Sequence, residues 1–200
     1  RELDLIMNEE SRKKFDIRSK AISSFRKTFA KQNYIEVEGP VLQTTLGGAT
    51  ARPFRTHHNT LDLDLNLRIA LELNLKRLIV GGFDRVFEIG RIFRNEGIST
   101  RHNPEFTMME CYEALGDYKR MMELTEQLVS NAAMDSIGRY EINIGTKDEP
   151  EMISLKPPYK KATMIGLIKE MLNIDMHPSM DLEKAREIAK ANGVVPKDHC

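Results

Sequence analysis

The chain has 200 residues, with 30 basic and 30 acidic side chains and a formal net charge of zero. This length is enough for a domain with a real hydrophobic core, and the balanced charge excludes the basic whole-protein field typical of nucleic-acid binders. No apolar run reaches the roughly 18 residues that span a bilayer, and Cys111 and Cys200 form no spaced pair. We therefore expect a reduced, cytoplasmic protein without a membrane or DNA partner.

Helices and strands are both predicted along the chain. Apolar residues at helical spacing, with Asp117 and Asp181 as N-caps, predict helices over 10–32, 71–80, 117–134, 164–172 and 181–191. Alternating or β-rich segments predict strands over 34–38, 61–67, 86–93, 106–115, 139–144 and 152–155. Hairpins with flanking helices, rather than strand–helix–strand crossovers, indicate an α+β fold with an antiparallel sheet. We expect a core over 1–160 and a separate helical segment over 161–200.

The strands 86–93 and 106–115 enclose a polar loop that carries most of the chemistry. Arg94 offers a planar fork suited to phosphate oxygens, and Glu96 can accept a hydrogen bond from an adenine amino group. By strand alternation, Glu96 is expected to project to the same side as Arg94. His102 adds a donor at the loop tip, and Phe106 can stack on a purine. The alternative is a solvated, charged surface hairpin, which each residue taken singly favours.

Three segments resemble the lysyl branch of the class II aminoacyl-tRNA synthetases. Motif 2 of that class resembles FEIGRIFRNEGISTRHNPEFTMMECYE, at 87–113. Motif 1, the dimer interface with its proline at Pro40, resembles FAKQNYIEVEGPVL. The amino-acid loop and the strand and helix that follow it resemble GGATARPFRTHHNTLDLDLNLRIALELNLKRLIVGG. This resemblance implies a class II sheet flanked by helices, with the start of a helical insertion over 161–200.

The resemblance assigns the ATP-binding residues. Arg94 would be the catalytic group that holds the α-phosphate, and Glu96 would contact the adenine amino group. His102 and Asn103 would lie near the triphosphate, with Phe106 stacked on adenine. ATP is then a substrate, and Mg²⁺ is the expected cofactor.

The resemblance to the lysyl synthetases also assigns a lysine site. Gly48 and Glu72 would hold the α-amino group of L-lysine, and Glu110 and Tyr112 would recognise its side-chain ammonium. A carboxylate facing a cation at ~4 Å contributes roughly 4 kcal/mol at an effective dielectric of ~20, before desolvation. The implied product is lysyl-adenylate, which is transferred to tRNA(Lys) by a homodimeric enzyme.

The sequence departs from the lysyl pattern. Leu71 and Asn74 stand where the pattern has Pro and Tyr, and we expect Asn74 to change the wall of the lysine pocket. Further departures are Glu113, Leu115 and Gly116. The 200 residues contain neither the third motif, with its arginine for the γ-phosphate, nor the acidic pair for Mg²⁺. We expect no metal site in this segment, a chain that is a piece of a longer protein, and weak or no activity from it alone.

Two other functions remain open at this stage. A lysine ligase that acts on a protein, such as translation elongation factor P, shares these motifs. A non-catalytic dimerising or regulatory module derived from a synthetase is the second. The pair His57–His58 lacks a Cys or a third His, so we expect it to be structural.

Overall fold

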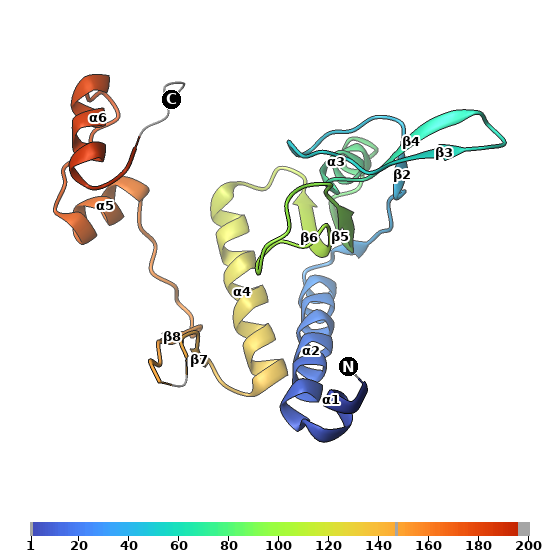
Figure 1. The fold of residues 1–200 in the computed structure, drawn as a ribbon, viewed down its shortest axis with the longest axis horizontal. Coiled ribbons are helices and arrows are strands. Elements are labelled where there is room, and N and C mark those ends of the chain that lie inside the picture. Colours follow the sequence, from blue (N-terminus) through green and yellow to red (C-terminus); the bar gives the residue numbers. More distant parts are fainter. Residues whose placement is uncertain (1, 147, 196–200) are drawn as a thin grey trace. The chain divides into compact units, whose positions relative to one another are not determined.

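A computed structural model describes residues 2–146 and 148–195, and the chain divides after Pro157 into two compact units (Figure 1). Cys200 lies outside the described residues. Helices and small sheets alternate, so the predicted α+β class is confirmed. Across the described ranges, no helix is both long and apolar enough to cross a bilayer.

The central sheet has the order β1-β5-β6, with β1 over Ile35–Glu36, β5 over Arg85–Phe93 and β6 over Glu105–Glu113. β5 and β6 form the predicted antiparallel hairpin. β1 runs parallel to β5, with Ile35 opposite Val86, so the expected purely antiparallel sheet is wrong at this edge. The long connection between β1 and β5, which includes a helix, makes parallel pairing sterically accessible.

A second sheet has the order β2-β4-β3, with β2 over Leu42–Gln43, β3 over Arg55–His58 and β4 over Leu63–Leu67. Only β4 was predicted. Every side chain of β3 is exposed, so it lacks the apolar alternation that marks a strand in sequence. His57 of β3 binds Asp64 of β4 through Nδ1 at 2.8 Å and lies 3.4 Å from Asp62. These contacts fit the structural role that we expect for the histidine, which stays a prediction.

Helices α2 (Glu9–Lys31) and α4 (Tyr118–Ile137) lie side by side and cover one face of the β5–β6 hairpin (Figure 1). Phe29 of α2 stacks on Phe87 of β5 with ring centroids 4.1 Å apart. Asp117 caps α4 as predicted, because its carboxylate accepts from the Arg120 N–H at 2.9 Å. The core on this face comprises Phe29, Tyr34, Phe87, Leu124 and Leu128.

Helix α3 (Glu72–Val80) covers the opposite face of the hairpin. Leu71 and Leu75 pack there on Val86 and Ile92, and all four side chains are buried. This face also carries Phe106, Met108 and Tyr112. Strand alternation therefore separates a face that packs on α2 and α4 from a face that carries the predicted site residues.

The remaining elements are short. α1 spans Glu2–Met7, and the hairpin of β7 (Glu141–Asn143) and β8 (Met152–Ser154) follows α4. The second unit holds α5 (Met164–Leu172) and α6 (Leu182–Ala191). α6 is capped by Asp181, as predicted, through the N–H groups of Glu183 and Lys184.

A buried ion pair joins the segments on the site face. The side chains of Arg68 and Glu88 are 4% and 3% exposed and bind each other directly. Arg68 also donates to the carbonyls of Gly39 at 3.1 Å and Arg91 at 2.8 Å, while Glu88 accepts from the Gly39 N–H at 3.1 Å. A Cβ at Gly90 would overlap the Arg68 guanidinium, so this position requires glycine.

We expect Arg68→Met to lower the free energy of unfolding by about 3–5 kcal/mol, because it leaves the Glu88 charge buried without its partner. Urea denaturation measures the loss. Arg91→Met is the matched control, since it removes an exposed pair with Glu105 at 3.4 Å. That variant should cost less than about 1 kcal/mol. Equal losses for the two variants would contradict this account of Arg68.

A second polar network lies on the face of the hairpin that α2 and α4 cover. The buried carboxylate of Glu113 accepts from the Tyr34 hydroxyl at 2.6 Å and from Arg120 at 3.1 Å, and it pairs with Arg85 at 3.0 Å. Burial alone would raise the pKa of Glu113. The Tyr34 hydrogen bond and the charges of Arg120 and Arg85 outweigh burial, so the pKa is lowered from its ordinary value.

This lowered pKa predicts a pH-dependent contribution to stability. A carboxyl group with a depressed folded-state pKa stabilises the fold above its unfolded pKa of about 4.3, and the contribution is lost as pH falls through the folded value. Glu113→Gln should therefore cost about 1–3 kcal/mol at neutral pH and less at acid pH. Denaturation at pH 7 and pH 3 measures this, with Glu105→Gln as control. A cost independent of pH would rule the assignment out.

Candidate functional site

The alternation argument assumes extended backbone from Arg94 to Glu96, but these residues lie in the loop between β5 and β6. β5 ends at Phe93, so Arg94 and Glu96 follow the strand rather than extend it. The Glu96 N–H donates to the Arg94 carbonyl at 3.0 Å, and the Arg94 N–H donates to the Pro104 carbonyl at 2.8 Å. A local turn, not strand alternation, therefore sets the relation between these two side chains.

The predicted ATP residues surround one cavity of about 300 Å³. The Arg94 guanidinium lies over the Phe106 ring, 5.3 Å from its centroid, and its Nε donates to the Ile69 carbonyl at 3.4 Å. A cation and an aromatic face on one wall suit a phosphate and a base, respectively. The lining comprises Arg94, Glu96, Gly97, Arg101, His102, Asn103 and Phe106.

The loop tip is held by Ser99, a residue that the sequence analysis did not single out. Ser99 and His102 exchange backbone hydrogen bonds, and the Ser99 hydroxyl lies 2.8 Å from Nδ1 of His102. The Ser99 hydroxyl also accepts from the Arg101 N–H at 3.2 Å. The Asn95 N–H donates to the Arg52 carbonyl at 2.8 Å, which ties this loop to the glycine-rich segment. These contacts fix the backbone at the loop tip and hold the His102 ring.

The predicted α-amino site lies at the start of α3. Gly48 has φ +82°, and a Cβ there would stand 2.8 Å from the Glu72 Cβ and 3.3 Å from its Oε2. The Glu72 carboxylate therefore faces the glycine loop at a distance that only glycine permits. A positively charged group beside the Glu72 carboxylate would also lie close to main-chain atoms of the glycine loop.

Glu110 and Tyr112 lie together on the same face of β6. The Tyr112 hydroxyl donates to Glu110 Oε2 at 3.1 Å, and the Leu71 N–H donates to Glu110 Oε1 at 3.2 Å. Burial and then the nearby Glu110 charge raise the pKa of Tyr112, so the phenol is a protonated donor at neutral pH. The Leu71 contact was not foreseen, because a backbone donor leaves no sequence signal.

Lys76 also enters this cluster. Its Nζ binds Glu72 Oε1 and lies 5.8 Å from the centroid of the Tyr112 ring. The spacing of four residues from Glu72 on a helix is a signal that could have revealed the pair. The structure thus brings Gly48, Glu72, Glu110 and Tyr112 into one cluster, together with Lys76 and the Leu71 N–H.

The departures from the lysyl pattern lie mostly away from this cluster. Asn74 accepts from Arg77 at 3.5 Å and lines a hollow with Pro40, and its effect on the lysine-pocket wall stays a prediction. Residues two apart on a helix do not share a face. Cys111 packs on the α2–α4 side, where burial and then Glu113 raise its pKa to about 11. Leu115 is fully exposed, at the end of the hairpin.

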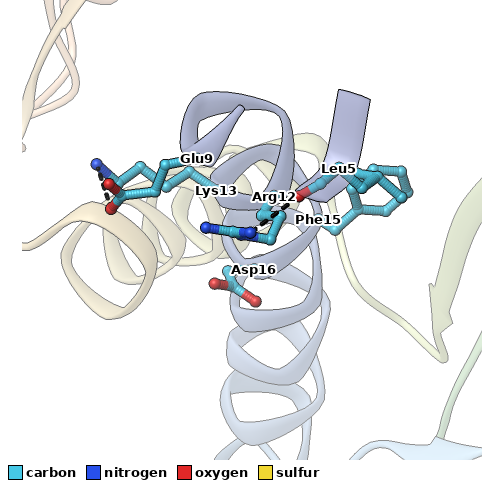
Figure 2. Close-up of a pocket in the computed structure, with 6 residues that line it drawn as sticks. All are labelled: Leu5, Glu9, Arg12, Lys13, Phe15 and Asp16. Carbon is cyan, nitrogen blue, oxygen red and sulfur yellow. Dashed lines mark hydrogen bonds and ion pairs between the residues drawn. The ribbon is translucent and has the colours of Figure 1, made fainter. Parts of the chain in front are cut away.

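A larger hollow, of about 590 Å³, lies where α1 meets α2 (Figure 2). Arg12 donates to the carbonyls of Leu5 and Ile6 at 2.9 and 3.1 Å, and Lys13 pairs with Glu9 at 3.0 Å. The guanidinium thereby satisfies carbonyls in the last turn of α1. These charges serve the helix junction, and the hollow contains none of the predicted site residues.

The described part of the chain contains no group of three or more His, Cys, Asp or Glu side chains that could hold a metal ion.

The model of the family described as tRNA synthetases class II (D, K and N) matches residues 1–194 of the chain. The chain belongs to this family. It is 51% identical over 198 residues to the lysine–tRNA ligase of Bacillus subtilis (strain 168) and 50% identical to that of Lysinibacillus sphaericus (strain C3-41). Each match covers 99% of this chain and 39% of the relative's length.

The close approach of the Gly48 backbone to Glu72 can be tested by substitution. Gly48→Ala should lower the free energy of unfolding by about 1–3 kcal/mol, because it combines a strained positive φ with a clash against Glu72. Gly82→Ala is the control, since Gly82 has φ +100° with no atom within 4 Å of the added Cβ. Chemical denaturation compares the two variants. A loss for Gly48→Ala no larger than that for Gly82→Ala would show that the close contact is unimportant.

Proposed function

We propose that this chain is part of the catalytic domain of a lysine–tRNA ligase, which activates L-lysine with ATP and transfers it to tRNA(Lys). One observation carries the proposal. Phe106, Glu110 and Tyr112 lie on one face of β6, so the cavity at the loop and the acidic cluster share a single strand. The 50–51% identity to lysine–tRNA ligases over nearly all of this chain supports it.

The spacing along β6 fits a substrate pair laid end to end. Glu110 lies four positions after Phe106 on β6, which corresponds to roughly 13 Å along an antiparallel strand. With adenine on Phe106 and the lysine ammonium on Glu110, the reacting carboxylate and the α-phosphate fall between these two positions. Arg94, at the base of the loop, lies over the Phe106 ring.

The chemistry that follows needs no protein nucleophile. A carboxylate oxygen of lysine attacks the α-phosphorus of ATP, and the bond to the bridging oxygen of pyrophosphate breaks. Arg94 stabilises the charge that develops on the α-phosphate, while Glu96, His102, Asn103 and Phe106 position the nucleotide. A terminal ribose hydroxyl of tRNA then attacks the carbonyl carbon of lysyl-adenylate, and AMP leaves.

Lysine selectivity arises from two separated carboxylates. Glu72, opposite Gly48, would take the α-ammonium, and Glu110 with Tyr112 would take the side-chain ammonium. Each carboxylate is partly shielded from solvent, which strengthens its attraction for a cation. A ligand that lacks either ammonium leaves one carboxylate without its partner.

Mg²⁺ offsets phosphate charge in this class of reaction, and we expect the complete enzyme to use it. The described residues supply no cluster of ligands for it. The steps given above therefore use only side chains of this chain.

Pro40 and its neighbours are proposed to form the dimer interface. Pro40 is exposed after β1, and the apolar side chains of Ile35, Val41 and Leu42 around it are 38–50% exposed. In this proposal α2 and β1 form motif 1, the β5–β6 hairpin forms motif 2 of a class II sheet, and residues 161–200 begin a helical insertion. The enzyme would work as a homodimer in the cytoplasm.

Two alternatives rank below this proposal. A ligase that attaches lysine to a protein would share the same activation site, and a non-catalytic module would need none of it. The relatives are named for tRNA charging, and the residues proposed for ATP line a single cavity. Parallel assays with tRNA and with elongation factor P as acceptors separate the two ligases.

Glu110→Gln should weaken L-lysine binding by about 10–100-fold, because it replaces a charge-assisted hydrogen bond by a neutral one. Isothermal titration calorimetry measures the affinity. Glu105→Gln, an exposed position on the same strand, is the control and should bind like the wild type. Equal affinities of the wild type and Glu110→Gln would refute a lysine site at Glu110.

A further inference from the structure

Lys76 places a cation of the protein inside the site proposed for a cationic substrate. It lies one helical turn after Glu72 on α3, and its Nζ binds Glu72 Oε1. The same nitrogen lies 5.8 Å from the ring centroid of Tyr112, on the neighbouring strand. The Lys76 side chain is 54% exposed, so packing does not account for its position.

The two oxygens of Glu72 have different environments. Oε1 is bound by Lys76, whereas Oε2 faces the glycine loop, 3.3 Å from the place of a Cβ on Gly48. Because position 48 is a glycine, the space beside Oε2 that a Cβ would fill is open. The ion pair with Lys76 therefore decides which oxygen of Glu72 is presented to a ligand beside Gly48.

We propose that Lys76 is a positioning residue for amino-acid recognition. It fixes the Glu72 carboxylate so that Oε2 receives the α-ammonium of the substrate, and it stays bound to Oε1 while the substrate is present. This role rests on the proposed function of Glu72. Lys76 contacts no part of the substrate in this scheme and acts only through Glu72.

One physical effect supports the assignment. A glutamate side chain has several rotamers, and holding it in the binding orientation before the ligand arrives reduces the entropy lost on binding. Lys76 holds Glu72 through Oε1, and among the described residues it forms no ion pair with Glu110. The effect therefore favours binding of an amino acid at Glu72 and leaves the Glu110 end of the site unaffected.

A competing role for Lys76 makes the opposite prediction. If its ammonium merely occupies the place of the substrate, then the substrate must displace it. Removing Lys76 would then tighten lysine binding. The direction of the change in affinity separates a positioning residue from a competitor.

The test uses two ligands that differ only in the α-ammonium: L-lysine and 6-aminohexanoate. Their dissociation constants are measured by calorimetry, directly or by competition, for the wild type, Lys76→Met and Lys76→Arg. Lys76→Met should weaken L-lysine binding by roughly tenfold and 6-aminohexanoate binding by less than about twofold. Lys76→Arg keeps the charge beside Oε1 and should restore most of the affinity for L-lysine.

Lys13→Met is the matched control, because it removes an equivalent helical pair with Glu9, 3.0 Å long and distant in sequence from the site residues. It should change neither dissociation constant. Unchanged or tighter L-lysine binding by Lys76→Met would overturn the inference, as would equal weakening of both ligands. Failure of the wild type to bind L-lysine would overturn the proposed function and this inference together. Circular dichroism verifies that each variant is folded.

Discussion

The buried pair of Arg68 and Glu88 is the interaction on which the arrangement of the site depends. Two opposite charges, almost fully removed from solvent, are stable only when further hydrogen bonds complete them. Here those bonds come from backbone groups of Gly39 and Arg91, and the Arg68 carbonyl itself accepts from the Phe93 N–H at 3.1 Å. The pair thereby ties the segment before β2, the segment before α3 and the end of β5 to one another.

The Arg68–Glu88 pair belongs to one face of the β5–β6 hairpin, and the Phe29–Phe87 contact belongs to the other. The ion pair lies beneath the site face of β5 and β6, where Gly90 leaves room for the guanidinium. On the other face, Phe29 and Phe87 hold the hairpin to α2. Each face of the hairpin thus combines an apolar cluster with a polar network. Side chains such as Glu110, which must meet a charged ligand, then stand on a fixed strand rather than on a mobile loop.

The sequence was most informative where a local pattern determines the structure. Periodicity located α2, α4 and the β5–β6 hairpin, and the N-caps Asp117 and Asp181 were identified from residue type alone. The strand β3 was not foreseen, because its exposed side chains give no apolar alternation. The strand β1 was predicted, but its parallel pairing with β5 was not, because it depends on a segment far away in the chain. The same holds within the site. Its residue types were recognisable, but the bond from the Leu71 N–H to Glu110 requires tertiary structure.

The hydrogen bond from the Leu71 N–H to Glu110 limits the directions from which a cation can approach that carboxylate. A carboxylate offers about four lone-pair positions, and on Glu110 the Leu71 N–H and the Tyr112 hydroxyl each occupy one. An incoming ammonium must approach along the directions that remain, so the site selects the angle of approach as well as the charge. A proline at position 71 has no N–H and would free one of those positions. The main chain at the start of α3 therefore helps to determine how a cation is oriented, without contributing any charge.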